Sequence, residues 1–471
     1  MDPCLRSAVE LRSALAVGEV SAVEVLEAVL GRADRLAGPI NPFAVRLDER
    51  ARSAASAADA DLTLGGGGPL CGVPVTIKDS HYLAGVSAAS GSRALEAFIP
   101  AESSAAVERL EAAGAVIFAK TTTPEFCYFG ITDSPVNGRT SNPWDLGRTP
   151  GGSSGGAGAA VAAGLGPLAL GGDGGGSIRI PAAFCGLVGF KPTFGLVPRE
   201  PCAVGWKTLV AYGPMARSVA DARLMLRALA GWHPRDRHSL DVDALDTPVA
   251  DPHGLRVVAS EDLGFAPLDD DVRAAFRSVV ALLEDAGAQI VDDTTGLGSS
   301  VMTWSTIATA EARHSEASSF EHHHALLGEA AAEFMAHGGR VTREQYVSAQ
   351  MAREPIHRAY VDLFDRSGAS VLLTPTLGLE AFAHGSAHPR RVGGVPIEAP
   401  WLDWCGFLYD ANLAGLPACA VPVGFGDDGL PVSVQVLGPR GSDGAVLAAA
   451  EAIERLVDFS ARPTELETLE K

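Results

Sequence analysis

The stretch that most constrains the fold is Gly171-Gly172-Asp173-Gly174-Gly175-Gly176-Ser177, a glycine-rich loop directly after the apolar run Leu168 to Leu170. A second glycine-framed serine lies 24 positions upstream, Ser153 in Gly151-Gly152-Ser153-Ser154-Gly155-Gly156. Further upstream, Val73, Val75 and Ile77 alternate along a run that ends at Lys78. Such alternation predicts a strand with one buried face. The three segments therefore predict strand ends and loops that carry a lysine and two serines.

This combination of residues is typical of a serine hydrolase. A serine hydroxyl becomes a good nucleophile when a neighbouring base accepts its proton, and the oxyanion that forms needs hydrogen-bond donors. The amides of Gly174 to Gly176 carry no side chains, so they are free to turn toward a substrate oxygen. Lys78 acts as a base only when neutral, which requires burial to lower its pKa by about 2–3 from about 10.4.

Alternative interpretations of the same residues fit less well. Glycine runs are most often turns, and a lysine at a strand end is most often solvated. Neither loop has the lysine of a phosphate-binding P-loop, and Ser177 falls where the last glycine of the dinucleotide-binding fingerprint belongs. Gly151 to Gly155 also matches the nucleophile elbow of α/β-hydrolases, which would make Ser153 the nucleophile and require a histidine such as His384 or His388.

Longer segments of the chain closely resemble the amidase signature family, whose members use a serine, a cis serine and a lysine. The matching segments are Val73 to Asp79, the loop at 151–156, Ser177 to Gly186, Lys191-Pro192-Thr193, Asn142-Pro143-Trp144, Gly213 to Ser218, and Asn412 to Gln435. The resemblance implies that Ser177 is the nucleophile, Ser153 the bridging serine and Lys78 the general base. It also implies oxyanion donors among the amides of Gly174, Gly175, Gly176 and Ser177, and no metal or organic cofactor.

The resemblance further implies the architecture, a single α/β domain over 1–471 with a central mixed sheet covered by helices on both faces. Its signature core would span about 70–200, and variable segments at about 200–212 and 295–410 would shape the pocket. Among supporting residues we expect Ser154 to join the two loops and Asp173 to pair with Arg179. Aromatic residues at Tyr128, Trp206, Tyr212, Trp401 and Trp404 are candidates for an apolar pocket, although aromatics so spaced are often core residues.

The implied activity is hydrolysis of carbon–nitrogen bonds in neutral, apolar or aromatic amides by a stand-alone enzyme, with esters and aryl carbamates as further substrates. One alternative is the glutaminase component of a tRNA-dependent amidotransferase. Family members with that function commonly have Gln at the position of Ile180 in this chain. Another is a catalytically inactive binding relative, which an intact Lys78, Ser153 and Ser177 argue against. Gly172 and Gly174 also depart from the family, because they replace hydroxyl-bearing residues.

Composition narrows the partners. The chain has 471 residues, 47% of them hydrophobic, and a formal net charge of −20, which favours a folded protein and disfavours binding to nucleic acid. We expect a monomer or homodimer in the cytoplasm, with no membrane anchor and a small-molecule amide as its substrate. Seven scattered cysteines indicate free or buried thiols, and His322-His323-His324 indicates a solvated helix face rather than a metal site.

Periodicity predicts helices at about 22–36, 48–60 and 270–286, and a surface connection at about 233–253. It predicts strands at 73–78, 115–119, 168–170, 256–259, 371–374, 419–423 and 432–437, which together could form one sheet.

Overall fold

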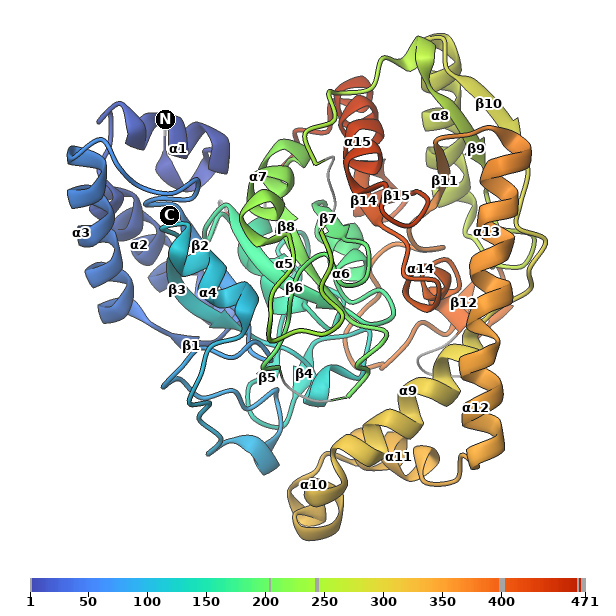
Figure 1. The fold of residues 1–471 in the computed structure, drawn as a ribbon, viewed down its shortest axis with the longest axis horizontal. Coiled ribbons are helices and arrows are strands. Elements are labelled where there is room, and N and C mark those ends of the chain that lie inside the picture. Colours follow the sequence, from blue (N-terminus) through green and yellow to red (C-terminus); the bar gives the residue numbers. More distant parts are fainter. Residues whose placement is uncertain (1, 203–204, 242–244, 398–402, 464–465, 467–471) are drawn as a thin grey trace.

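The fold is built on an 11-stranded mixed β-sheet (Figure 1). The structure is a computed structural model, and it describes residues 2–202, 205–241, 245–397, 403–463 and 466. In spatial order its strands are β1 (Phe43–Arg46), β3 (Val116–Thr121), β2 (Pro74–Lys78), β6 (Leu168–Asp173), β8 (Ala211–Ala216), β7 (Val188–Lys191), β14 (Ala418–Phe425), β15 (Pro431–Leu437), β11 (Val371–Pro375), β9 (Arg256–Ala259) and β10 (Gln289–Asp292). Every strand expected from the sequence lies in this sheet, so the prediction of a single central sheet is confirmed.

The sheet mixes both strand directions. β2 is parallel to its neighbours β3 and β6, whereas β8 is antiparallel to β6 and β7. In the β2–β6 pair Ile77 lies opposite Leu170, which places Lys78, the last residue of β2, beside the carboxyl-terminal part of β6. The carboxyl ends of parallel strands meet at one edge, and this brings the predicted lysine next to the predicted nucleophile loop.

Helices cover both faces of the sheet. Alternate residues of β6 belong to different cores: Leu168 and Leu170 pack in a large cluster with Val75 and Ile77, while Ala169 packs with Ile178 and Met215 on the opposite face. The helices are α1 (Ala8–Ala16), α2 (Ala22–Ile40), α3 (Asp48–Thr63), α4 (Ala105–Ala112), α5 (Gly155–Ala162), α6 (Arg179–Phe184), α7 (Val219–Leu229), α8 (Asp270–Asp285), α9 (Val301–Ser315), α10 (Ala317–His322), α11 (Glu329–Gly338), α12 (Arg343–Met351), α13 (Arg353–Ser367), α14 (Tyr409–Leu413) and α15 (Asp443–Val457).

Local sequence explains the helix boundaries. Ser21 begins α2 with a capping box to Glu24, and Asn41 ends it in the left-handed conformation. The helix thus runs four residues beyond the predicted end at 36, through Pro39. The helix predicted at 270–286 is α8, which buries Val272, Phe276, Val279 and Leu283.

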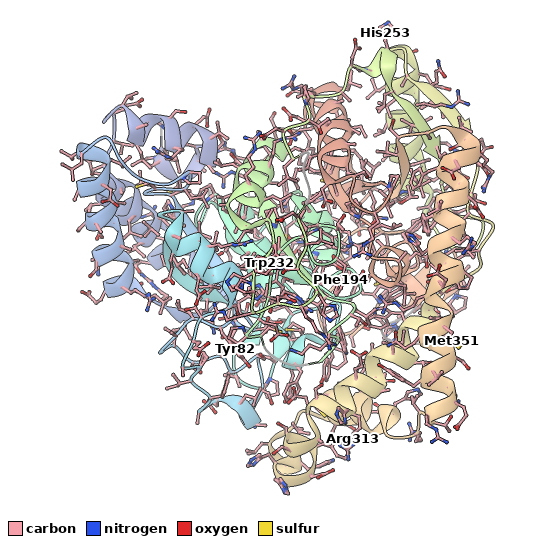
Figure 2. All side chains as sticks on the ribbon, viewed as in Figure 1. Tyr82, Phe194, Trp232, His253, Arg313 and Met351 are labelled. Atoms are coloured by element: carbon pink, nitrogen blue, oxygen red, sulfur yellow. The ribbon has the colours of Figure 1, made fainter. Side chains whose placement is uncertain are left out.

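Two short hairpins, β4 (Asp133–Ser134) with β5 (Gly138–Arg139) and β12 (Arg391–Val392) with β13 (Val395–Pro396), lie outside the sheet. Helices α9 to α12 extend from the sheet as an arm (Figure 1). Arg313 of α9 and Met351 of α12 mark that arm among the side chains of Figure 2. The packing of α9 matters for the site, because Trp304 reaches from this helix to the nucleophile loop.

Candidate active site

Lys78 is the last residue of β2, and its side chain is buried. Its Nζ donates a hydrogen bond to Ser153 Oγ at 2.6 Å and approaches the carbonyl oxygen of Gly172 at 3.5 Å. Burial lowers the pKa of the Lys78 amine from its ordinary value, with the nearby Cys127 and Asp173 acting in the opposite direction. No carboxylate of the described residues lies within 4.0 Å of this amine.

Ser153 and Ser154 lie at the start of α5, and Ser154 contacts the second glycine loop. The Gly152–Ser153 peptide is cis, and the carbonyl of Ser153 accepts a hydrogen bond from the Thr123 hydroxyl at 2.8 Å. The hydroxyl of Ser154 is 3.3 Å from both the carbonyl oxygen and the amide nitrogen of Gly172. The amide of Ser154 also donates to the carbonyl of Ser177 at 3.1 Å. Ser154 therefore joins the loops, as the sequence predicted.

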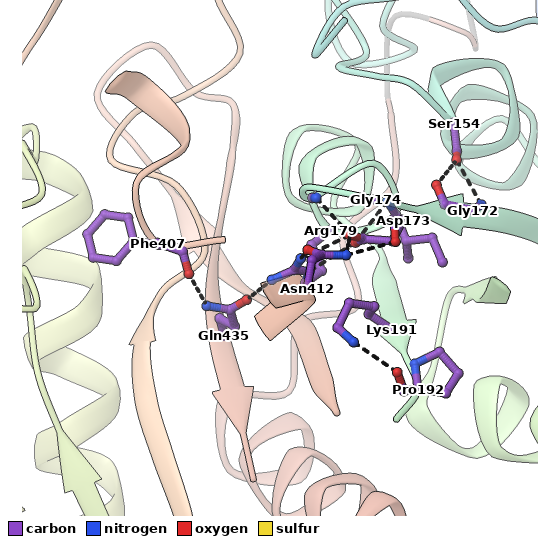
Figure 3. A network of polar contacts seen from close by, with 12 residues as sticks. Ser154, Gly172, Asp173, Gly174, Arg179, Lys191, Pro192, Phe407, Asn412 and Gln435 are labelled. Atoms are coloured by element: carbon purple, nitrogen blue, oxygen red, sulfur yellow. Dashed lines mark hydrogen bonds and ion pairs between the residues drawn. The ribbon is translucent and has the colours of Figure 1, made fainter. Parts of the chain in front are cut away.

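Asp173 anchors the nucleophile loop through a buried network (Figure 3). Its carboxylate is bound by Arg179, with Nε to Oδ2 at 2.9 Å and Nη2 to Oδ1 at 3.0 Å, which is the predicted charge pair. Arg179 also donates to the side-chain oxygens of Asn412 and Gln435, each at 2.6 Å. Burial acts to raise the pKa of the Asp173 carboxyl, but the Arg179 guanidinium outweighs it and holds that pKa well below its usual range.

Some backbone amides of the nucleophile loop already donate a hydrogen bond within the protein, and others do not. The Gly176 amide donates to Asp173 Oδ1 at 2.7 Å, so the prediction that Gly176 contributes an oxyanion donor is not supported by this geometry. Within the described residues no acceptor is found for the amides of Gly174, Gly175 and Ser177. The carbonyl of Gly174 accepts from Trp304 Nε1 at 2.7 Å, which fixes the orientation of its peptide.

A cavity opens onto Lys78, Ser153 and Ser177. Of the predicted pocket residues, Tyr128, Trp206 and Tyr212 line it. Sequence reasoning did not assign several further lining residues, namely Ser80, Ser90, Phe126, Cys127, Arg199 and Val210. Phe126 and Cys127 have φ values of 50° and 64°, a left-handed turn that no glycine or asparagine in this segment signals.

Trp404, another predicted pocket residue, lies elsewhere. Trp404 is a buried core residue between Phe184 and Phe382, at ring-centroid distances of 6.1 and 5.5 Å, and it does not line this cavity. Trp401 lies outside the described residues. The nucleophile-elbow hypothesis finds no base, because His384 Nε2 approaches Ser141 and His388 Nδ1 approaches the Pro389 carbonyl, while Ser153 is bonded to Lys78.

A second buried lysine provides an internal contrast. Lys120, on the neighbouring strand β3, forms an ion pair with Asp79 at 3.2 Å and donates to the Ser87 carbonyl at 2.6 Å. Lys78, one strand away, instead contacts a serine hydroxyl. His81 is also buried beside Lys78, with its ring centroid 4.0 Å from that of Tyr212. Burial lowers the pKa of His81 well below 6.5, so this imidazole is neutral.

The histidine run and the cysteines form no second site. His322, His323 and His324 are exposed, and within the described residues no three histidine, cysteine or acidic side chains are grouped as metal ligands would be. All seven cysteines are free, and Cys127 is the only one that is not buried. In the same part of the chain, no helix has the length and apolarity that a membrane span requires.

A strand-end lysine bonded to a serine, beside a glycine-rich loop that carries a second serine, is the arrangement expected of a hydrolase of the serine–serine–lysine class. The chain belongs to the amidase family, whose model matches residues 24–447. It is 36% identical to an acylamidase of Rhodococcus erythropolis, with 95% of this chain and 94% of that protein covered. It is equally 36% identical to the A subunit of the glutamyl-tRNA(Gln) amidotransferase of Gloeobacter violaceus, with 96% and 97% covered.

Solved structures agree on the fold and the chemical class. A bacterial aryl acylamidase of the amidase signature family matches with a TM-score of 0.90 and 28% identity, covering 97% of each chain. A 6-aminohexanoate cyclic dimer hydrolase in complex with its substrate matches with a TM-score of 0.87 and 28% identity, covering 98% of this chain and 99% of that one. The chain is therefore an amidase signature amidohydrolase that acts on amide carbon–nitrogen bonds.

Proposed function

We propose that this protein is a stand-alone amidase that hydrolyses amides with apolar or aromatic acyl groups through an acyl-serine intermediate. The observation that carries the proposal is the 2.6 Å bond between the buried Lys78 amine and the Ser153 hydroxyl, in the cavity that Ser177 also lines. A buried lysine without a carboxylate partner favours its neutral form, and only that form accepts a proton.

In the proposed reaction, Ser177 Oγ attacks the substrate carbonyl carbon while its proton passes through Ser153 to Lys78. The new C–O bond gives a tetrahedral oxyanion, which the amides of Gly174, Gly175 and Ser177 stabilise. The carbon–nitrogen bond then breaks, and the proton returns through Ser153 to the leaving nitrogen. Water repeats the cycle on the acyl-enzyme, releasing the acid and free Ser177.

The hydrogen bonds of the nucleophile loop support this role for its free amides. Asp173 occupies the Gly176 amide and, at 3.2 Å, the Ile178 amide, so the carboxylate holds the loop without entering the cavity. The loop is therefore preorganised before substrate arrives, which is the condition under which oxyanion donors contribute most to the rate. The mechanism requires no metal or organic cofactor.

Four aromatic side chains, Phe126, Tyr128, Trp206 and Tyr212, line the cavity and favour an apolar or aromatic substrate. We also propose that the whole chain works as one domain and that the segments at about 200–212 and 295–410 shape specificity. Trp206, Val210 and Tyr212 come from the first segment, and Trp304, Cys405 and Tyr409 from the second. Esters and aryl carbamates share the acyl-serine chemistry and are proposed as secondary substrates.

The test is turnover of an apolar acyl 4-nitroanilide by the wild type and by Ser177→Ala. We expect the substitution to lower kcat by about 10^4 or more, because it removes the nucleophile, with thermal unfolding unchanged. A fluorophosphonate should label Ser177. A label on Ser153 instead would assign the nucleophile to the elbow and refute the proposed roles.

A second candidate function is the glutaminase component of an amidotransferase, which the similarity to amidotransferase A subunits favours. Ile180 argues against it. Glutamine and the anilide, assayed with the protein alone, separate the two functions. Under our proposal the anilide is the better substrate; glutamine hydrolysis that appears only with an added partner protein would favour the second.

A further inference from the structure

Two hollows meet at Ser177. The cavity described above contains Lys78, Ser153 and Arg199. A smaller hollow is lined by Phe129, Gly130, Gly175, Ile180, Trp304, Cys405 and Tyr409. Only four of the described residues line both, namely Cys127, Tyr128, Ser177 and Trp206. The nucleophile and its immediate neighbours therefore lie between two spaces of different size and chemistry.

Proton transfer determines which half of the substrate occupies each hollow. The leaving nitrogen must receive a proton from Ser153 and Lys78, and both residues line the larger hollow and not the smaller. The leaving amine therefore belongs in the larger hollow. The acyl group extends from the other side of the carbonyl carbon, toward the smaller, aromatic hollow beside the Gly175 amide.

Trp206 is held firmly between these spaces. Its Nε1 donates to the Ala308 carbonyl at 2.7 Å, its ring stacks on Tyr128 with centroids 5.6 Å apart, and Trp304 meets it edge-on at 5.4 Å. Its φ is 51°, in the left-handed region that a bulky residue rarely adopts. Neighbouring contacts thus hold the indole in place at a strained backbone position.

The absence of a side chain at Gly174 leaves room for the Trp206 indole. A Cβ atom at residue 174 would lie 2.6 Å from Cε3 of Trp206 and 3.0 Å from Cγ2 of Val210. A hydroxyl-bearing residue at 174 therefore cannot coexist with the indole as it lies here. The glycine and the tryptophan form a matched pair, in which a small residue on the oxyanion loop admits a large one above it.

We propose that Trp206, seated on Gly174, is the partition that limits the acyl group to short or flat substituents and so determines the acyl specificity of the enzyme. This inference rests on the proposed function for the identity of the substrate halves. The geometry of the pair itself does not depend on it.

The experiment uses four proteins: the wild type, Trp206→Ala, Gly174→Thr and the double variant. The first measurement is the rate at which ethyl- and decyl-phosphonyl fluorides label Ser177. In that reaction the Oγ–P bond forms, the P–F bond breaks, fluoride leaves and Lys78 takes the serine proton, so the alkyl chain replaces the acyl group. The second measurement is kcat/KM for 4-nitroanilides with acetyl, hexanoyl and benzoyl groups.

We expect Trp206→Ala to raise the decyl-to-ethyl labelling ratio by about 10-fold or more, because opening a pocket by several methylene volumes changes selectivity by at least that factor. Gly174→Thr alone should slow labelling by both probes, and adding Trp206→Ala should restore part of the rate, which gives a favourable coupling between the two positions. Trp206→Phe should shift the ratio in the same direction by less, and it replaces the alanine variant if that protein fails to fold.

Trp144→Ala is the matched control, since Trp144 also donates its Nε1 to a backbone carbonyl, that of Cys185 at 2.9 Å, but lines neither hollow. Its labelling ratio should equal that of the wild type. An unchanged labelling ratio in folded Trp206→Ala and Trp206→Phe would overturn the partition. A shifted labelling ratio in an enzyme that cleaves no anilide would instead retain the partition and refute the proposed function.

Discussion

Two regions around Ser177 differ in how their polar groups are satisfied. The nucleophile platform, which we define as Lys78, Ser153, Ser177, Asp173, Arg179 and Asn412, contains the buried Lys78–Ser153 hydrogen bond and a two-bond Asp173–Arg179 ion pair to which Asn412 is also bonded. The pocket wall, which we define as Cys127, Tyr128, Arg199, Trp206 and Trp304, is mostly aromatic. In the wall the buried Tyr128 hydroxyl has no hydrogen-bond partner among the described residues.

This difference indicates that the platform is needed for catalysis on every substrate and that the wall sets the selectivity between substrates. Removing one member of a satisfied buried network leaves its partners uncompensated, so the platform tolerates little change. Aromatic packing accepts other shapes at lower cost than a network of buried charges, so the wall is free to vary with the substrate. Substitutions in the platform should therefore abolish activity on every substrate, whereas those in the wall should change ratios between substrates.

The largest effect is expected at Lys78. Lys78→Ala should lower kcat/KM by about 10^3–10^4, because it removes the general base. In the wild type, activity should rise with pH through a limb whose apparent pKa lies below the 10.5 of an ordinary lysine, since burial lowers the pKa and the neutral amine is the active form. pH–rate profiles measure this limb. A profile that follows a histidine, or a mild effect of the substitution, would contradict the assignment.

Lys120→Ala is the control for burial alone. Lys120 is buried on the adjacent strand but pairs with Asp79. Its loss should lower thermal stability without removing the rising limb of the pH profile in the protein that remains folded.

The next effect is expected at Asp173. Asp173→Asn removes the charge that compensates Arg179, in a pair whose side chains are both 0% exposed. We expect the free energy of unfolding to fall by about 3–5 kcal/mol and kcat to fall with every substrate. Urea unfolding and anilide kinetics measure the two. The matched surface pair is Arg366–Asp293, exposed by 45% and 31%, where Asp293→Asn should cost about 0–1 kcal/mol. Equal costs at the two sites would contradict the distinction between platform and surface.

The platform was more predictable from the sequence than the wall. Lys78 and the two serines are visible because a strand pattern and glycine loops are local signals, and the sheet follows from its apolar runs. The occupation of the Gly176 amide by Asp173 was missed, because it depends on the path of the loop in space. Strand β8 was also missed, since Gly213 and Pro214 lie within it and proline cannot donate to a strand ladder.

Which residues line the pocket wall depends on where their side chains point in the folded protein. Trp206 and Trp404 are both buried tryptophans near the site, yet only the first lines the cavity, because packing rather than spacing decides where each ring points. Cys127 lines it through a left-handed turn at Phe126 and Cys127 that the sequence does not announce. Local periodicity therefore locates strands and loops, while selectivity residues emerge only from the assembled fold.

A smaller effect is expected from alkylation of Cys127. It is the only cysteine that is not buried, and it lines both hollows. N-ethylmaleimide should form a thioether at Cys127 and lower kcat/KM by about 10-fold or more, because the adduct displaces the substrate from its reactive position. Peptide mapping with residual-activity measurements tests this. Cys127→Ala, treated in the same way, should keep its own untreated rate. Modification at Cys127 without loss of activity would show that the wall accommodates the adduct.

The smallest effect is expected at Arg199, which probes the leaving-group side of the wall. Its guanidinium is buried, donates to the Lys207 carbonyl at 2.7 Å, and has no carboxylate within 4.0 Å among the described residues. A leaving amine that carries a carboxylate would supply that partner. We therefore compare two anilides with the same acyl group, one releasing 4-nitroaniline and the other 5-amino-2-nitrobenzoate. Arg199→Gln should lower the ratio of kcat/KM for the carboxylated substrate to kcat/KM for the plain substrate by about 3- to 10-fold, as expected for one partly screened ion pair. High salt should reduce the wild-type ratio in the same direction. The ratio cancels any general loss of activity in the variant, so it reports the charge alone. A ratio that is identical in the two proteins would place the leaving amine away from Arg199 and reverse the assignment of the two hollows.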